Sequence, residues 1–261
     1  MIDFDLPART EKPRAHGLSN LVDNGYGLGE LRDKLALAAD FIDIVKLGWA
    51  SANITNCLKD KVSLFKTNDI TTCPGGMLFE LSWWQGKMAA YIDFLVTHEI
   101  TMAEVSNGSL PIPEKKKREM ISLLVNEGFT VLSEVGSKDV SVNAPPAVWV
   151  DCLKRDLDCG AWKVIAEGRA DASAGIYDTS GEFRFEVINA ILGSGIPLDA
   201  IIFEAPHKQQ MKWFVENVGP NVNIGNVPLG EVLNLETLRL GLRGDTVWHF
   251  HEGNEVSMPV R

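Results

Sequence analysis

Short hydrophobic runs recur along this chain, and most are followed by a segment with helical spacing of apolar residues. The runs do not alternate strictly between polar and apolar residues, which is expected of parallel strands buried on both faces. They cover residues 17–23, 41–49, 70–73, 101–106, 130–136, 162–168, 200–205 and 222–225. The pattern predicts eight strands that pair in parallel through helical crossovers.

The segments between the runs predict the helices. Residues 51–65 place Ile54, Leu58, Val62 and Phe65 on one face of a 3.6-residue period. Residues 31–39, 78–97 and 182–192 are further helical segments. Other helices are expected to begin at prolines, because the missing N–H costs nothing in a first turn; these are Pro113, Pro145, Pro206 and Pro228.

Alternating strands and helices over 261 residues predict an α/β fold, a single-domain (βα)8 barrel of the TIM type. An open dinucleotide-binding sheet is less favoured, because no GxGxxG follows the first strand. We expect residues 1–16 to form a poorly packed N-terminal arm, residues 17–246 the barrel and residues 247–261 a C-terminal tail.

Composition restricts the partners. The chain carries 25 basic and 35 acidic residues, a net charge of −10, which argues against binding nucleic acid or an anionic membrane. A local group of cations could still hold a small anion. A barrel of this size is also compatible with a homo-oligomer.

The N-terminus lacks the apolar core of a signal peptide, and no apolar run reaches the roughly 20 residues of a membrane span. The four cysteines are scattered without a CxxC pair. We therefore interpret them as reduced thiols and expect a cytoplasmic protein.

Glutamates recur near the ends of four successive predicted strands, at Glu104, Glu134, Glu167 and Glu204. In a barrel these strand ends meet at one mouth, where four acids would repel each other unless a cation lay among them. The pattern indicates a divalent metal site, most simply Mg²⁺. The alternative is that some of these side chains point outward, where they cap helices or pair with Lys163, Lys138 or Arg169.

Basic residues follow other strands of the predicted barrel, namely Lys46, Lys138, Arg169 and Lys208. Together they would suit a small, multiply charged anion, although each alone could be a solvated side chain. The charged run at residues 114–118 is interpreted as the solvated face of a helix, without a function.

Gly225-Asn226, just before the helix expected at Pro228, resembles the common phosphate site of barrels, where backbone N–H groups hold phosphoryl oxygens. A simple glycine turn is the alternative. His207 could act as an acid or base, but a lone histidine at a helix start is more often structural.

Seven segments carry a resemblance to a known family. They are residues 40–49, 74–80, 104–109, 134–136, 203–210, 221–226 and 238–246. Over residues 17–246 the chain resembles the phosphosulfolactate synthase family. The resemblance implies a (βα)8 barrel that adds sulfite to phosphoenolpyruvate with Mg²⁺, giving 2-phospho-3-sulfolactate, which begins coenzyme M biosynthesis in methanogens. Plant heat-stress-associated proteins share the resemblance, so membership alone does not establish this reaction.

The resemblance also implies roles for single residues. Metal ligands, or residues next to them, would be Glu104, Glu134 and Glu167. The catalytic group would be Lys46, as an electrostatic or proton-transfer residue, with Lys138 and Glu204. Substrate, and above all its phosphate, would be held by Lys208, Gly225, Asn226, Arg243 and Arg169.

Three positions depart from the family pattern. Asn107 replaces the acid of a usual Ser-Asp-Gly-Ser, Ser137 replaces the first of two lysines, and residues 169–173 replace a usual Glu-Ser-Gly loop. Three explanations remain open: Lys138 and Asp171 compensate, the protein uses another nucleophile or acceptor, or it is a non-catalytic barrel of the heat-stress-associated type.

Overall fold

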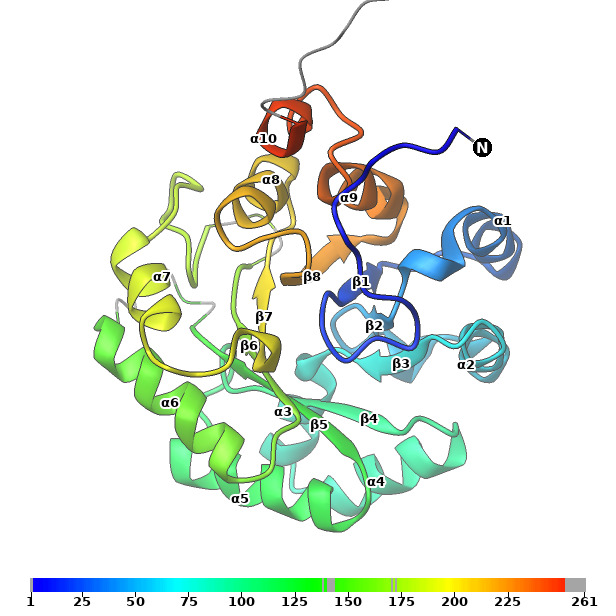
Figure 1. The fold of residues 1–261 in the computed structure, drawn as a ribbon. Coiled ribbons are helices and arrows are strands. Elements are labelled where there is room, and N and C mark those ends of the chain that lie inside the picture. The colour runs from blue at the N-terminus through cyan, green and yellow to red at the C-terminus, as the bar shows by residue number, and fades with distance from the viewer. Residues whose placement is uncertain (1, 138, 140–143, 170, 172, 252–261) are drawn as a thin grey trace, which may run out of the picture.

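The computed structural model describes residues 2–137, 139, 144–169, 171 and 173–251, and shows strands ringed by helices (Figure 1). Every strand ladder is parallel, in the order β3-β2-β1-β8-β7-β6-β5-β4, and β3 lies against β4 to close the barrel. The predicted (βα)8 barrel is confirmed. Its strands are β1 Ser19–Asp23, β2 Ile44–Leu47, β3 Thr71–Pro74, β4 Met102–Val105, β5 Thr130–Val135, β6 Lys163–Ala166, β7 Ile201–Glu204 and β8 Asn223–Pro228.

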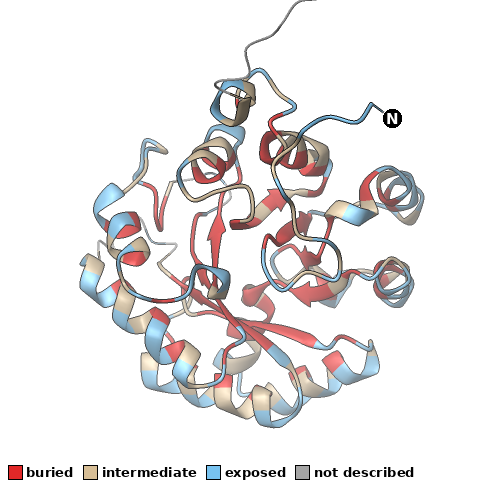
Figure 2. Cartoon of the chain, in the orientation of Figure 1, coloured by how far each residue is buried: buried red, intermediate tan, exposed pale blue. Residues whose placement is uncertain are grey.

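The helices cover the outside of the barrel and turn their buried faces toward the strands (Figure 2). They are α1 Leu28–Ala38, α2 Leu58–Lys66, α3 Gly76–Trp84, α4 Met88–Thr97, α5 Glu114–Asn126, α6 Pro146–Asp158, α7 Phe185–Leu192, α8 Lys208–Asn217, α9 Val232–Arg239 and α10 Val247–His251. None of the helices in the described part of the chain has the length and hydrophobicity that a membrane span requires. All four cysteines are free thiols, as predicted.

An apolar layer fills the barrel interior beneath its mouth. It consists of Leu18, Ile44, Cys73, Met102, Leu132, Ile165 and Ile202. Because side chains of a strand alternate between its two faces, the residue two positions further along points into the same interior. From β2 and β4–β7 these next residues are Lys46, Glu104, Glu134, Glu167 and Glu204. A layer of charged side chains therefore lies directly above the apolar layer, on the side of the barrel mouth.

Two predicted helices are wrong in detail. Residues 78–97 form α3 and α4 instead of one helix, since Gly86 takes a φ of +66° that breaks the first. Residues 51–65 begin with a short 3-10 turn, Ser51–Ile54, and α2 starts only at Leu58. Ile54 is consequently 80% exposed and does not share the buried face of α2.

Strand β8 is longer than the predicted residues 222–225. Its pairing with β1 shifts register between Ser19 and Leu21, and Asn226 takes a φ of +56° there. This is a β-bulge, a device that redirects a side chain and is common next to active sites. Gly225 and Asn226 therefore lie within the strand. Pro228 precedes only a 3-10 turn, and α9 begins at Val232.

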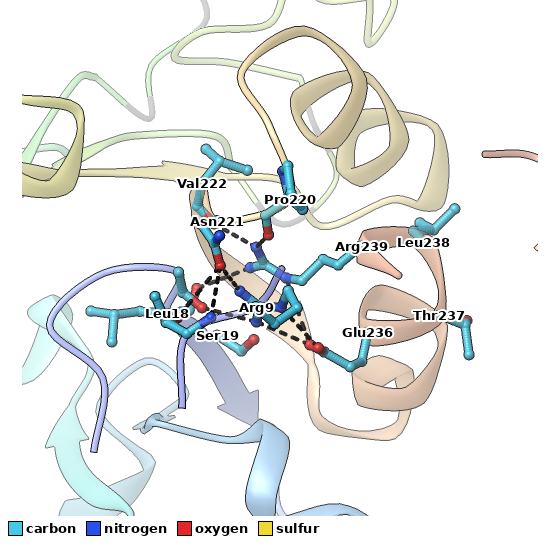
Figure 3. Close-up of polar contacts among 12 residues, drawn as sticks. Arg9, Leu18, Ser19, Pro220, Asn221, Val222, Glu236, Thr237, Leu238 and Arg239 are labelled. Carbon is cyan, nitrogen blue, oxygen red and sulfur yellow. Dashed lines mark hydrogen bonds and ion pairs between the residues drawn. The ribbon is translucent and has the colours of Figure 1, made fainter. Parts of the chain in front are cut away.

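The N-terminal arm is tied to the barrel, so its expected poor packing is wrong from Arg9 onward. Arg9 binds the Glu236 carboxylate through two nitrogens, at 2.9 and 3.1 Å, and donates to Asn221 (Figure 3). Arg14 pairs with Asp43 at 3.0 Å, and Lys12 donates to two backbone carbonyls. Basic side chains thus fasten the arm across the amino-terminal end of the barrel.

Arg239 lies fully buried beside the arm (Figure 3). Its guanidinium donates to the carbonyls of Pro220, Val222 and Leu18, at 2.6–3.1 Å. Burial, together with the charge of Arg9, lowers the pKa of Arg239 to about 9. The arginine joins β1, the start of β8 and α9 at the end of the barrel opposite to its mouth.

The charged run at residues 114–118 is not wholly solvated. Lys117 is buried, and its ammonium donates to the Glu134 carbonyl at 2.6 Å and to the Asp156 carboxylate at 2.8 Å. Ser133 donates to the same Asp156 carboxylate. The burial of Lys117 was not predicted from periodicity, because a lysine in a charged run is expected at the surface. In the structure Lys117 joins α5 and α6 to β5.

We predict that Arg9→Ala lowers the free energy of unfolding by about 3 kcal/mol, because it leaves the Glu236 carboxylate buried without its main partner. Urea denaturation measures this change. The control is Arg155→Ala, which removes an exposed pair with Asp151 and should cost under about 0.5 kcal/mol. Equal losses in the two variants would contradict the fastening role of the arm.

Candidate active site

A cavity of about 670 Å³, called here the main cavity, opens at the carboxyl ends of the strands. Its walls come from the loops that follow most of the strands, as in barrel enzymes generally. Its charged lining residues within the described chain are Lys46, Arg169, Glu104, Glu134, Glu167, Glu204, Asp139 and Asp171. Six carboxylates therefore face two cations.

Lys46 stands at the centre of the glutamates. Its ammonium lies 2.8 Å from Glu204, 3.2 Å from Glu104 and 3.9 Å from Glu134. Burial lowers the pKa of Lys46, but the attraction of these three carboxylates outweighs burial and holds that pKa well above its usual range. Lys46 is therefore protonated at neutral pH.

Glu104 is fixed from two sides. One carboxylate oxygen accepts from the Gly76 N–H at 2.7 Å, at the first turn of α3, and the other faces Lys46. A helix amino-terminus favours a negative charge. A side chain at Gly76 would meet the Ser106 hydroxyl at 2.3 Å, so only glycine allows this close approach. The Pro-Gly-Gly turn after β3 thus serves to hold Glu104.

Glu204 has partners on both oxygens. One accepts from Lys46, and the other accepts from the Gly168 N–H at 2.9 Å and the Asn226 amide at 3.3 Å. The bulge in β8 directs the Asn226 side chain toward the Glu204 carboxylate. Gly225 faces the barrel interior, where a side chain would meet Ile202 at 2.8 Å.

Three of the glutamates form a set that could bind a metal ion. Carboxylate oxygens of Glu134, Glu167 and Glu204 lie within 4.8 Å of one another, and all three residues are buried. Carboxylate oxygens are the ligands that Mg²⁺ prefers. The predicted set contained Glu104 in place of Glu204. The structure brings all four glutamates to the main cavity.

The residues predicted to hold phosphate do not gather in one place. Arg169 and Asn226 line the main cavity. Lys208 and Arg243 both pair with Asp245 and do not line it. Lys138 lies outside the described residues. His207 is the N-cap residue of α8, and its backbone N–H donates to the Gln210 side chain at 3.0 Å.

Two of the three departures from the family pattern do not face the main cavity. Asn107 and Ser137 line a second cavity of about 250 Å³ behind β5. The Asn107 amide donates to the Ile112 carbonyl at 3.1 Å and to the Glu114 carboxylate at 2.7 Å. An aspartate could donate neither bond. The third departure does reach the site, because Arg169 and Asp171 line the main cavity.

Sequence reasoning assigned no role to Glu80, although it shapes the same rim. The side chain is fully buried in α3, and its carboxylate accepts from the Ser106 hydroxyl and from the N–H groups of Ser109 and Leu110. A single acid within the apolar helix α3 is the signal that could have identified it, since a buried charge needs partners.

Similarity to known proteins extends over most of the chain. The family model described as (2R)-phospho-3-sulfolactate synthase (ComA) matches residues 7–245. A phosphosulfolactate synthase of Bacillus subtilis (strain 168) is 42% identical, over 94% of this chain and 99% of its own. A phosphosulfolactate synthase of Methanothermobacter thermautotrophicus is 38% identical, over 94% of this chain and 96% of its own.

Solved structures of lower identity share the fold. The 3-hexulose-6-phosphate synthase of Salmonella typhimurium superposes with a TM-score of 0.56 at 15% identity, over 84% of this chain and 97% of that one. Such a likeness concerns the barrel alone. The match of the family model over most of the chain and the identity to the curated relatives show more: this chain belongs to the phosphosulfolactate synthase family.

Proposed function

We propose that this protein adds sulfite to phosphoenolpyruvate and forms (2R)-2-phospho-3-sulfolactate. The observation that carries the proposal is the position of Lys46 among four glutamates of the main cavity, in a chain of this family. The sequence departures at Asn107 and Ser137 line the second cavity and are not among the lining residues of the main cavity. Four free thiols are consistent with our proposal that the reaction takes place in the cytoplasm.

We further propose that the enzyme works with Mg²⁺ held by Glu134, Glu167 and Glu204. Among the described lining residues, six carboxylates and two cations give an excess of negative charge, which repels phosphoenolpyruvate and sulfite because both are anions. A divalent ion supplies the missing positive charge and polarises substrate oxygens. The three carboxylates fit this role because they are buried, close together and made of hard oxygen donors.

The proposed reaction joins one sulfur atom to one carbon atom. The sulfur lone pair of sulfite forms a bond to the methylene carbon of phosphoenolpyruvate. The electron pair of the carbon–carbon double bond then moves toward the carboxylate of the substrate. A proton delivered to the phosphate-bearing carbon by an acid in the cavity completes the addition, and no oxidant or reductant is needed.

Lys46 is assigned to electrostatic stabilisation in this scheme. Its ammonium faces the main cavity and remains charged because of its glutamate neighbours. A fixed positive charge in a low-dielectric site stabilises the negative charge that develops on the substrate carboxylate. A neutral amine, which a general base would require, is disfavoured by the same neighbours.

We predict that Lys46→Met reduces formation of the sulfonated product by roughly 10³-fold, because it removes the charge opposite the developing carboxylate. The assay is mass detection of the adduct after incubation with phosphoenolpyruvate, sulfite and Mg²⁺, and circular dichroism verifies the fold. Lys66→Met is the control, since Lys66 forms an exposed pair with Glu99. Full activity of folded Lys46→Met would remove this lysine from the mechanism.

We predict that Mg²⁺ raises the melting temperature of the wild type, and that Glu134→Gln and Glu167→Gln each weaken this effect, with Kd increased roughly 10-fold or more. Differential scanning calorimetry across a Mg²⁺ titration gives the apparent Kd. Glu99→Gln at the surface is the control and should bind as the wild type does. Unchanged Mg²⁺ dependence in both cavity variants would place the ion elsewhere.

Restoring the family's acid should not improve this enzyme. We predict that Asn107→Asp loses about 1–3 kcal/mol of stability and gains no activity, because it removes two donors and sets a second carboxylate beside Glu114. Asn217→Asp, which alters an exposed bond to the Trp213 carbonyl, is the matched control. A faster Asn107→Asp variant of normal stability would show that an acid at this position acts in catalysis.

A further inference from the structure

The loop between β6 and α7 returns to the barrel and contacts two of the proposed metal ligands. After residue 173 the chain forms a narrow turn closed by an antiparallel bridge between Tyr177 and Phe183. The segment Gly175–Tyr177, called here the brace segment, lies against the ends of β6 and β7. No role was assigned to it from the sequence.

The brace segment makes one hydrogen bond to the main chain of each glutamate. The Ile176 N–H donates to the Glu167 carbonyl at 2.8 Å. The Tyr177 hydroxyl donates to the Glu204 carbonyl at 2.7 Å. Two adjacent residues therefore hold the backbones of two ligands that lie on neighbouring strands.

The contacts between the brace segment and the strand ends leave no space for a side chain at two glycines. Gly175 has a φ of +80°, and a Cβ atom on it would lie 2.0 Å from the Glu167 carbonyl oxygen. A Cβ atom on Gly168 would lie 2.5 Å from the Tyr177 ring and 2.7 Å from the Glu204 carbonyl oxygen. Glycine at both positions allows the loop and the strand ends to touch directly.

The brace segment is itself anchored from outside. The Arg184 guanidinium donates to the Gly175 carbonyl at 3.1 Å. The Phe183 ring packs on Tyr177 at 5.3 Å, and on Trp213 and Phe214 of α8 at 4.8 and 5.8 Å between ring centroids. An aromatic cluster on the outer layer thus fixes the segment that touches the glutamates.

We propose that the brace segment positions Glu167 and Glu204 for a divalent cation, with Tyr177 as a positioning residue that acts through the Glu204 main chain. Both carboxylates are buried and of like charge, so contacts that fix the two strand ends relative to each other help to hold them close together. Hydrogen bonds that orient ligand residues commonly govern metal affinity. The inference rests on the metal site of the proposed function.

The first test compares two buried tyrosines. Tyr177→Phe deletes only the hydroxyl that holds Glu204, whereas Tyr91→Phe deletes a buried hydroxyl that has no hydrogen-bond partner among the described residues. We expect Tyr177→Phe to raise the Kd for Mn²⁺, measured on the protein without substrate by electron paramagnetic resonance, roughly 10-fold. Tyr91→Phe should stay within twofold of the wild type.

The second test compares two glycines of the same backbone conformation. Gly175→Ala and Gly195→Ala both introduce a side chain at a φ near +80°, but only the first drives it into Glu167, while Gly195 has open space around it. Backbone strain alone would affect the two equally. We expect Gly175→Ala to lose Mn²⁺ binding by more than 10-fold, and Gly195→Ala to bind as the wild type does.

The outcomes separate this inference from the metal site on which it rests. If the wild type binds Mn²⁺ and the affinity is unchanged in Tyr177→Phe and Gly175→Ala, the positioning role of the brace segment is wrong, but the metal site stands. A wild type that binds no Mn²⁺ overturns both. Lower melting temperatures without weaker Mn²⁺ binding would show that the segment is merely structural, which also overturns the proposal.

Discussion

The attraction between one ammonium group and the carboxylates around it governs the organisation of this barrel. Lys46 lies within 3.9 Å of three buried glutamates, and Glu167 completes the ring beside two of them. Without the lysine these acids would face one another in a low-dielectric interior, where like charges repel strongly. The surrounding structure fixes this group of charges by an apolar floor below it and by backbone donors at Gly76 and Gly168.

That arrangement also explains why the site suits its proposed chemistry. The described lining of the cavity carries more negative than positive charge, whereas the proposed substrates are anions, and the proposed divalent cation would resolve this mismatch. In the proposed scheme the cation offsets the negative charge of these glutamates. The Lys46 ammonium lies beside it and stabilises the substrate carboxylate as the carbon–sulfur bond forms. In the proposed scheme, the same cluster that fills the barrel mouth also takes part in catalysis.

Much of this site was predictable because side chains along a strand alternate between its two faces. Glutamates near the ends of successive strands had to meet at one mouth once the barrel closed, and Lys46 follows the same rule from β2. Details that depend on contacts between distant segments were not predictable. Lys117 is buried because Asp156 of another helix meets it, and Arg9 is fastened because Glu236 lies beside it.

Backbone conformation was a second feature that could not be predicted from the sequence. Gly86 splits a continuous apolar pattern into two helices, and the bulge at Asn226 lengthens β8, because both residues adopt a positive φ that the pattern of apolar residues does not encode. Tyr177 is the clearest example within the site. Its hydroxyl reaches a main-chain carbonyl 27 residues away, and no residue pattern encodes such a contact.

The central claim is that this cavity accepts an anionic substrate only together with a cation. Isothermal titration calorimetry of the wild type with phosphoenolpyruvate, once with Mg²⁺ and once with a chelator, tests it most directly. The account predicts binding in the first titration and none in the second. Equal affinity in the two titrations would contradict it, because the glutamates would then not need a metal to receive the substrate.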